Sequence, residues 1–173
     1  WFISQICLHN NFPVKTYGTL GYYINGKKKN NSRLTTPEYE VLHQNAFSKK
    51  KNIFNFIFEV SSHALEQKRL INFPINIAAL TNISHDHLDY HKNYTKYKET
   101  KLKLFINYLS KNGCAIINDR IRGIENFKKK LSKKYKIITY GKISSHINLR
   151  SIKNNIEIKI YKKKIFIKIR LLY

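Results

Sequence analysis

Two short apolar runs, each followed at once by polar side chains, constrain the fold of this chain most strongly. The runs are residues 53–58 and 75–80, and both are rich in Ile, Phe or Ala. Residues 59–63 (EVSSH) follow the first run, and residues 81–91, with three histidines and two aspartates, follow the second. Mostly apolar runs of this length are typical of strands buried in a parallel sheet. Because ligands bind beyond the carboxyl ends of such strands, we expect the two polar clusters to form one shared site.

The rest of the chain predicts an α/β fold with a change of pattern near residue 141. Helical signals occur at residues 1–9, from Thr35-Thr36-Pro37 onward, after residue 63, and at 94–109 and 124–131. Further strands are expected at residues 18–22, 115–118 and 137–140, with a solvated polar loop at 24–33. Beyond residue 141, Ile alternates with charged residues, which predicts an antiparallel hairpin. We therefore expect a mostly parallel sheet flanked by helices over residues 1–140, and a small antiparallel β-sheet over residues 141–173, as parts of one domain.

Composition limits the classes of function. A length of 173 residues suffices for one domain with a real core. The formal net charge of +23 would suit nucleic-acid binding, but the lysines are spread along the chain rather than clustered, which favours a compositional bias of the genome. Cys7 and Cys114 form no CxxC pair, which fits a reducing cytoplasm. No apolar run approaches the roughly 20 residues of a membrane span. We expect a cytoplasmic protein without membrane insertion.

One lysine in the helix predicted at residues 94–109 departs from the usual pattern. Tyr97, Phe105 and their neighbours at helical spacing mark a buried stripe. Lys101 falls in that stripe, four residues after Tyr97 and four before Phe105. A lysine on an inward face must lose its charge, find a partner or be chemically modified, unless it extends its ammonium group to solvent from the edge of the stripe.

The cluster at His85, His87 and Asp89 permits two metal chemistries. One is a zinc hydrolase, because His-x-His-x-Asp partly matches the HxHxDH motif of metallo-β-lactamase-like enzymes. In that motif the last histidine directly follows the aspartate, whereas here Tyr90 comes before His91. The other is a magnesium-assisted phosphoryl-transfer site, in which carboxylates hold the ion beside phosphates.

Several short motifs in fixed order favour the second chemistry. They are Gly18–Tyr22, Thr35–Pro37, residues 59–65 (EVSSHAL), Gln67, Arg69, Thr81-Asn82, residues 86–91 (DHLDYH) and Lys101. In this order and spacing they resemble the central domain of the Mur ligases, over nearly the whole chain. Within that family they are most similar to the branch that acts on UDP-MurNAc-L-alanyl-D-glutamate.

The resemblance implies a P-loop NTPase-like central domain of an ATP-dependent ligase of peptidoglycan biosynthesis. Such an enzyme phosphorylates the terminal carboxylate of UDP-MurNAc-L-Ala-D-Glu with ATP and then forms an amide with the amine of an amino acid. The sequence does not decide between meso-diaminopimelate and lysine as the added amino acid, and meso-diaminopimelate is expected because it is the more frequent choice in the family. The resemblance further implies Mg²⁺ as cofactor and a monomer that binds no nucleic acid.

The resemblance also assigns roles to individual residues. It implies that Glu59 binds one magnesium ion, and that His87 and a carbamylated Lys101 bind the second and are catalytic. Asn82 is implied to contact the nucleotide. The residues implied to contact the UDP-MurNAc-dipeptide are Thr35, Thr36, Ser61, Gln67 and Arg69.

Some features depart from the family pattern. The Gly-rich phosphate loop GTNGKT(T/S), expected just before Trp1, does not occur in the sequence. Leu34 stands where many relatives have asparagine, and Asn118-Asp119-Arg120 is shorter than the usual NxDD motif. We therefore expect the 173 residues to form an incomplete central domain that is inactive alone.

Overall fold

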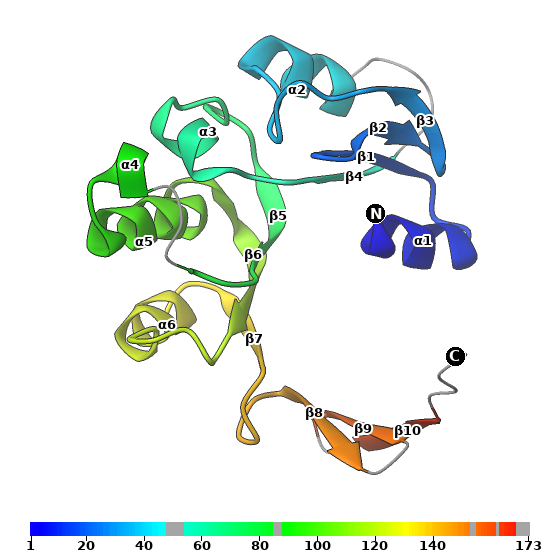
Figure 1. The fold of residues 1–173 in the computed structure, drawn as a ribbon, viewed down its shortest axis with the longest axis vertical. Helices are drawn as coiled ribbons and strands as arrows, with labels where there is room; N and C mark the ends of the chain where they lie inside the picture. Colours follow the sequence, from blue (N-terminus) through cyan, green and yellow to red (C-terminus); the bar gives the residue numbers. More distant parts are fainter. Residues whose placement is uncertain (48–53, 85–87, 153–154, 162, 169–173) are drawn as a thin grey trace. The chain divides into compact units, whose positions relative to one another are not determined.

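The computed structural model describes residues 1–47, 54–84, 88–152, 155–161 and 163–168 (Figure 1). The chain divides into two compact units. The first comprises Trp1–Phe73 with Thr95–Lys103, and the second comprises Pro74–Tyr94 with Leu104–Tyr173. Among the described residues, no helix is long and apolar enough to cross a membrane.

The first unit contains a four-stranded sheet in the order β3-β2-β1-β4. Strand β1 pairs with β4 in parallel, whereas the β1–β2 and β2–β3 pairs are antiparallel. The elements are α1 (Phe2–His9), β1 (Val14–Gly18), β2 (Gly21–Ile24), β3 (Lys27–Asn30), α2 (Tyr39–Ala46), β4 (Asn55–Phe58), α3 (Ser62–Glu66) and most of α5 (Tyr94–Lys103). Its core includes Val14, Leu42 and Leu70, each at most 1% exposed.

A tight turn explains one difference from the sequence prediction in this unit. Residues 18–22 form the junction of β1 and β2 rather than one strand, because Gly21 has φ +116, a backbone conformation that side chains disfavour. A Cβ at this position would lie 2.6 Å from the carbonyl oxygen of Asn30. Residues 27–30, expected in a polar loop, form the exposed edge strand β3. Their solvent exposure was predicted and is confirmed.

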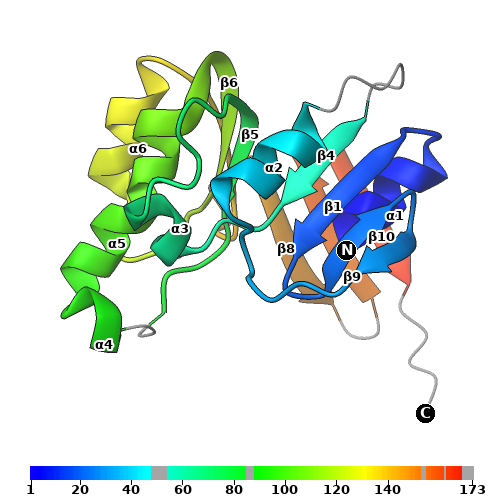
Figure 2. The same cartoon turned by 90° about the horizontal axis from the view of Figure 1, so that it is seen from above.

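The second unit contains a six-stranded sheet in the order β10-β9-β8-β7-β6-β5. Strands β5 to β8 pair in parallel, and β8, β9 and β10 pair antiparallel. The elements are β5 (Ile75–Leu80), α4 (Leu88–His91), the π-helix η1 (Leu104–Tyr108), β6 (Leu109–Asn118), α6 (Glu125–Ser132), β7 (Lys136–Tyr140), β8 (Ile147–Ile152), β9 (Asn155–Ile160) and β10 (Lys163–Lys168). Helix α6 packs beside β7 (Figure 1), and Figure 2 shows α6 near the end of β6. Phe105, Ile117 and Ile124 are fully buried in this unit.

The predicted α/β class, with a parallel sheet and an antiparallel tail, is confirmed. Strand β4 pairs with β1 and β5 pairs with β6, so the two strands lie in different sheets. A site shared by the polar clusters that follow them stays a prediction. The helix predicted at 94–109 is α-helical only to Lys103 and continues as the π-helix η1. A division of the chain at residue 140 stays a prediction.

Candidate functional site

The carboxylate of Glu59 lies against the turn between β1 and β2. Glu59 directly follows β4, and its backbone N–H donates to the carbonyl oxygen of Tyr17 at 3.0 Å, which continues the parallel pairing of β4 with β1. Glu59 Oε2 accepts hydrogen bonds from Thr19 N (3.1 Å) and Thr19 Oγ1 (2.8 Å). A Cβ on Gly18 would lie 2.7 Å from Glu59 Cδ, so glycine permits this approach. The sheet therefore holds an exposed carboxylate among hydroxyl and amide groups.

Thr36 connects the carboxylate to the start of α3. Its side chain is 1% exposed, and its Oγ1 donates to the carbonyl oxygen of Glu59 (2.8 Å) and accepts from Ser61 N (2.8 Å). Ser61 Oγ in turn accepts from Ala64 N at 3.2 Å and so caps α3. The hydroxyl of Thr35 lies 3.2 Å from that of Thr19. The two threonines predicted to bind substrate thus belong to the same network as Glu59.

Arg69 completes this group of side chains. Its Nη1 donates to the carbonyl oxygen of Thr36 at 2.8 Å, and its Nη2 donates to Gln67 Oε1. Its Nε lies 3.4 Å from Glu38 Oε2, a separation that makes an ion pair without a hydrogen bond. The side chain of Arg69 is only 12% exposed, so the guanidinium is held in one place. The structure thus joins all five predicted substrate-binding residues to Glu59 within the first unit.

The predicted magnesium ligands are placed only in part. His87, with His85 and Asp86, lies outside the described residues. Lys101 is half-buried, and its Nζ lies 4.7 Å from the ring centre of Tyr97, which is 2% exposed. An ammonium over an aromatic face is a favourable arrangement for the charged lysine. Carbamylation of Lys101 stays a prediction.

The oxygen atoms around Glu59 fit magnesium better than zinc. A carboxylate with neighbouring hydroxyls is the donor set of a hard cation, which keeps several of its own waters. Among the described residues, no three His, Cys, Asp or Glu side chains gather as a zinc site would require. Glu59 is therefore suited to hold Mg²⁺ together with ligands from outside this network.

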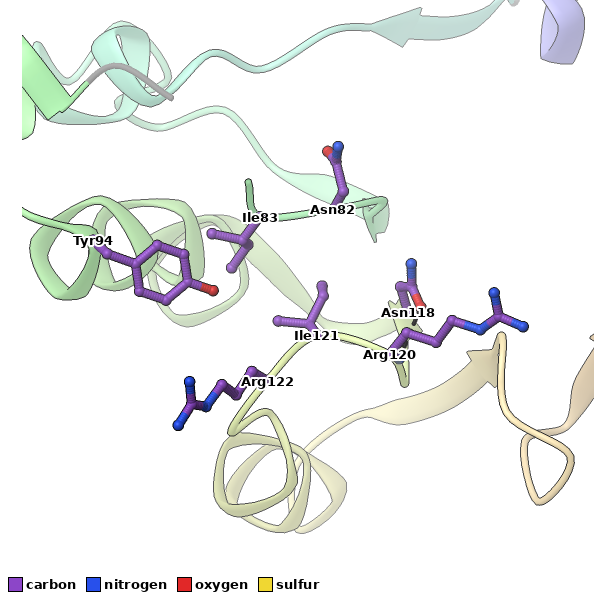
Figure 3. A pocket seen from close by; sticks show the side chains of 7 residues that line it. All are labelled: Asn82, Ile83, Tyr94, Asn118, Arg120, Ile121 and Arg122. Atoms are coloured by element: carbon purple, nitrogen blue, oxygen red, sulfur yellow. Dashed lines mark hydrogen bonds between the residues drawn. The ribbon is translucent and has the colours of Figure 1, made fainter. Parts of the chain in front are cut away.

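Asn82 lies in a separate pocket of about 500 Å³ in the second unit. Figure 3 shows Ile83, Tyr94 and Ile121 facing one another, whereas the guanidinium groups of Arg120 and Arg122 extend in opposite directions. Nearby, Asn118 donates through Nδ2 to the carbonyl oxygen of Thr81 at 2.8 Å. Asn118 therefore ties the end of β6 to the end of β5. A nucleotide contact for Asn82 stays a prediction.

Asp119 has a structural role that the sequence did not reveal. It is 4% exposed, and its carboxylate accepts hydrogen bonds from Lys128 Nζ and from Ser145 Oγ (2.6 Å). Burial opposes ionisation of Asp119, but these hydrogen bonds and the charge of Lys128 outweigh it and lower its pKa. The pKa of Lys128 is raised, because hydrogen bonds to Asp119 and Glu125 outweigh the effect of burial. The short Asn-Asp-Arg motif thus stabilises the second unit through its aspartate.

Two residues of the Glu59 network were missed from the sequence as site residues. Thr19 lies within the motif Gly-Thr-Leu-Gly, and Glu38 directly follows the motif Thr-Thr-Pro. Both motifs are among those that resemble the Mur ligases. Position in a motif was therefore an available signal for both. Their contacts, however, are to residues about 30 to 40 positions away in the chain.

Comparisons with known proteins agree on one family. The family model of the Mur ligase middle domain matches residues 1–172. A protein of Rickettsia bellii named UDP-N-acetylmuramoyl-L-alanyl-D-glutamate–2,6-diaminopimelate ligase is 35% identical over 162 residues, which is 91% of this chain and 34% of that protein. A protein of Rickettsia montanensis with the same name is 45% identical over 111 residues, which is 63% of this chain and 23% of that protein. The chain thus spans about a third or less of the length of these relatives.

Solved structures give the same result. A structure of a ligase with that name has a TM-score of 0.74 and 26% identity, and the match covers 96% of this chain and 35% of the other. The MurF ligase of Thermotoga maritima in complex with ADP shares the fold, with a TM-score of 0.63, 15% identity, and coverage of 96% of this chain and 36% of the other. Because the family model matches nearly every residue, this chain belongs to the Mur ligase middle-domain family.

Proposed function

We propose that this chain serves an ATP-dependent ligase that adds 2,6-diaminopimelate to UDP-MurNAc-L-alanyl-D-glutamate in peptidoglycan biosynthesis. The observation that carries the proposal is the 35% identity, across 91% of the chain, to a Rickettsia bellii protein named for this reaction. Membership in the Mur ligase family favours this function over the zinc hydrolase and over the nucleic-acid-binding module. We place the ligase in the cytoplasm as a monomer, with ATP, the UDP-MurNAc-dipeptide and the diamino acid as its partners.

The chemistry needs a carboxylate to become an acylating agent. Transfer of the γ-phosphoryl group of ATP to a substrate carboxylate gives an acyl phosphate and ADP. The amine of the diamino acid then attacks the acyl carbon, and the amide forms as phosphate leaves. The relation of the fold to a MurF structure in complex with ADP supports the use of ATP.

In this proposal the network around Glu59 serves phosphoryl transfer. Glu59 would hold one Mg²⁺ ion, and His87 with carbamylated Lys101 would hold a second. These ions would supply positive charge that neutralises the phosphates. Thr19 orients Glu59 through two hydrogen bonds to Oε2, so the carboxylate is positioned before the ligand arrives. Asn82 is proposed as a contact to the nucleotide.

The same network would bind the acidic substrate. Arg69 presents a fixed guanidinium, which suits a carboxylate of the D-glutamyl residue. Thr36 holds Arg69 through its carbonyl oxygen and holds Ser61 through its hydroxyl. Thr35, Ser61 and Gln67 provide further hydrogen-bonding groups beside it.

A binding experiment tests this assignment. Calorimetric titration of the chain with UDP-MurNAc-L-Ala-D-Glu should show binding. UDP-MurNAc-L-Ala, which lacks the glutamyl carboxylates, should bind at least tenfold more weakly, because a charged hydrogen-bonded pair contributes about 1.5–3 kcal/mol. Arg69→Met should remove this preference. Arg33→Met, which removes the same charge from an exposed position of the same unit, should keep it. Equal binding of both ligands to the unmodified chain would refute the proposed substrate.

Carbamylation of Lys101 has its own test. With ¹³C-labelled bicarbonate, we expect a carbamate carbon resonance in the chain that is lost in Lys101→Arg. Arginine keeps a cation near the Tyr97 ring but cannot form the carbamate, so folding should be retained. A spectrum without this resonance at saturating bicarbonate would contradict the assignment for this chain.

A further inference from the structure

The guanidinium of Arg69 has one edge that is not hydrogen-bonded. Nη1 and Nη2 donate to Thr36 and Gln67, but Nε is buried and has no hydrogen-bond partner among the described residues. A buried donor without an acceptor carries a desolvation cost that a correctly placed oxygen would remove. Arg69 is therefore only partly satisfied in this structure.

The carboxylate that covers this edge comes from Glu38. Its Oε2 lies 3.4 Å from Nε, beyond the usual range for a charged N–H···O hydrogen bond. The side chain of Glu38 is 57% exposed, whereas that of Arg69 is 12% exposed. One partner is thus fixed by two other hydrogen bonds, and the other is free to move into solvent.

We infer that Glu38 is an exchangeable counter-ion, which a carboxylate of the ligand displaces from the Nε edge of Arg69. The ligand carboxylate gains the hydrogen bond that Glu38 does not make, while Glu38 regains full hydration in solvent. Ligands without a carboxylate cannot displace Glu38 in this way. Glu38 is therefore a specificity-determining residue, and this inference rests on the proposed acidic substrate.

The matched substitutions are Glu38→Gln and Glu40→Gln. Both residues are exposed; Glu38 directly precedes α2 and Glu40 lies in its first turn. Each substitution therefore removes one negative charge from the same end of the helix. Only Glu38 forms an ion pair with Arg69 in the described structure. A general effect of charge on an acidic ligand would appear in both variants, whereas displacement of a counter-ion appears in Glu38→Gln alone.

The experiment measures binding of UDP-MurNAc-L-Ala-D-Glu and, as a ligand without any carboxylate, UDP-N-acetylglucosamine by calorimetry. We expect Glu38→Gln to bind the first ligand about two- to fivefold more tightly than the unmodified chain, the gain expected when a partly exposed ion pair need not be broken. Binding of the second ligand should not change, and Glu40→Gln should behave as the unmodified chain. Equal or weaker binding of the first ligand by Glu38→Gln would overturn the inference and make Glu38 a structural partner of Arg69.

A second measurement separates this inference from the proposed function. In ¹⁵N spectra, the Nε–H resonance of Arg69 can be followed while glutarate is added as a simple dicarboxylate. We expect the resonance to respond at lower glutarate concentration in Glu38→Gln than in the unmodified chain. If neither form binds the UDP-linked ligand, the proposed substrate fails, and the glutarate titration still decides the role of Glu38. Identical glutarate responses in both forms would refute it.

Discussion

Replacing Thr36 with valine tests the hydrogen-bond network that builds the candidate site. Valine has nearly the size and shape of threonine, so Thr36→Val removes the hydroxyl and leaves the packing in place. The lost hydroxyl makes two hydrogen bonds of 2.8 Å, one to the carbonyl oxygen of Glu59 and one from the N–H of Ser61. Both backbone groups would then lack these partners.

The expected cost follows from the burial of this position. Thr36 is 1% exposed, so water has little access to the atoms that the hydroxyl contacts. An unsatisfied buried group costs about 1–3 kcal/mol. Because Ser61 is half-buried and Glu59 is exposed, solvent can satisfy part of the loss, and we expect a total of about 2 kcal/mol in the free energy of unfolding. That is a factor of about 30 in the ratio of folded to unfolded chain.

Urea denaturation followed by far-ultraviolet circular dichroism measures this change. Thr36→Ser is the control, because it keeps the hydroxyl and loses only a methyl group, at a cost of about 1 kcal/mol or less. The reasoning predicts that valine destabilises the chain more than serine does. A Thr36→Val variant within about 0.5 kcal/mol of the unmodified chain, a change typical of surface substitutions, would refute it.

Three further substitutions test other parts of the structure. The pKa of Asp119 is lowered in the folded chain, so its stabilising contribution is present above its ordinary pKa of 3.8 and is lost as pH falls through the lower folded value. The urea concentration at the unfolding midpoint should therefore fall on acidification, and it should fall less steeply in Asp119→Asn. A pH dependence identical in both forms would contradict this. Gly18→Ala should displace the side-chain carboxylate of Glu59 with little loss of stability. The backbone amide of Thr19, which donates to this carboxylate, should then exchange its hydrogen faster, and unchanged exchange would argue against the contact. Leu42→Ala should lower the free energy of unfolding by about 2–5 kcal/mol, because Leu42 is fully buried, and a cost below about 1 kcal/mol would place it outside the core.

Local sequence patterns were most informative where a strand is almost entirely apolar or alternates strictly. Strand β5 begins and ends at the predicted residues 75 and 80, and the antiparallel β9–β10 hairpin was predicted from its alternating isoleucines. These patterns depend only on neighbours in the chain. Strand β3 was missed because four consecutive polar residues carry no such pattern, and their pairing with β2 comes from the backbone.

The candidate site shows the same limit. The motifs identified Glu59, Thr36 and Arg69 by type, but the sequence could not show that Thr36 binds the backbone on both sides of residue 60. The partner of Arg69 was equally hidden, because Glu38 precedes it by 31 residues. Lys101 was expected within a buried stripe, and the structure places it half-buried over the ring of Tyr97.

The sequence by itself determined the α/β class, most strand positions, and the residue types of a candidate site that resembles the Mur family, because periodicity and short motifs are properties of neighbouring residues. Only the tertiary structure decided that β4 and β5 belong to different sheets and that Glu59, Thr36 and Arg69 form one connected network. Strand order and side-chain contacts depend on which distant segments pack together. That choice reflects the balance of burial and hydrogen bonding over the whole chain rather than any local pattern.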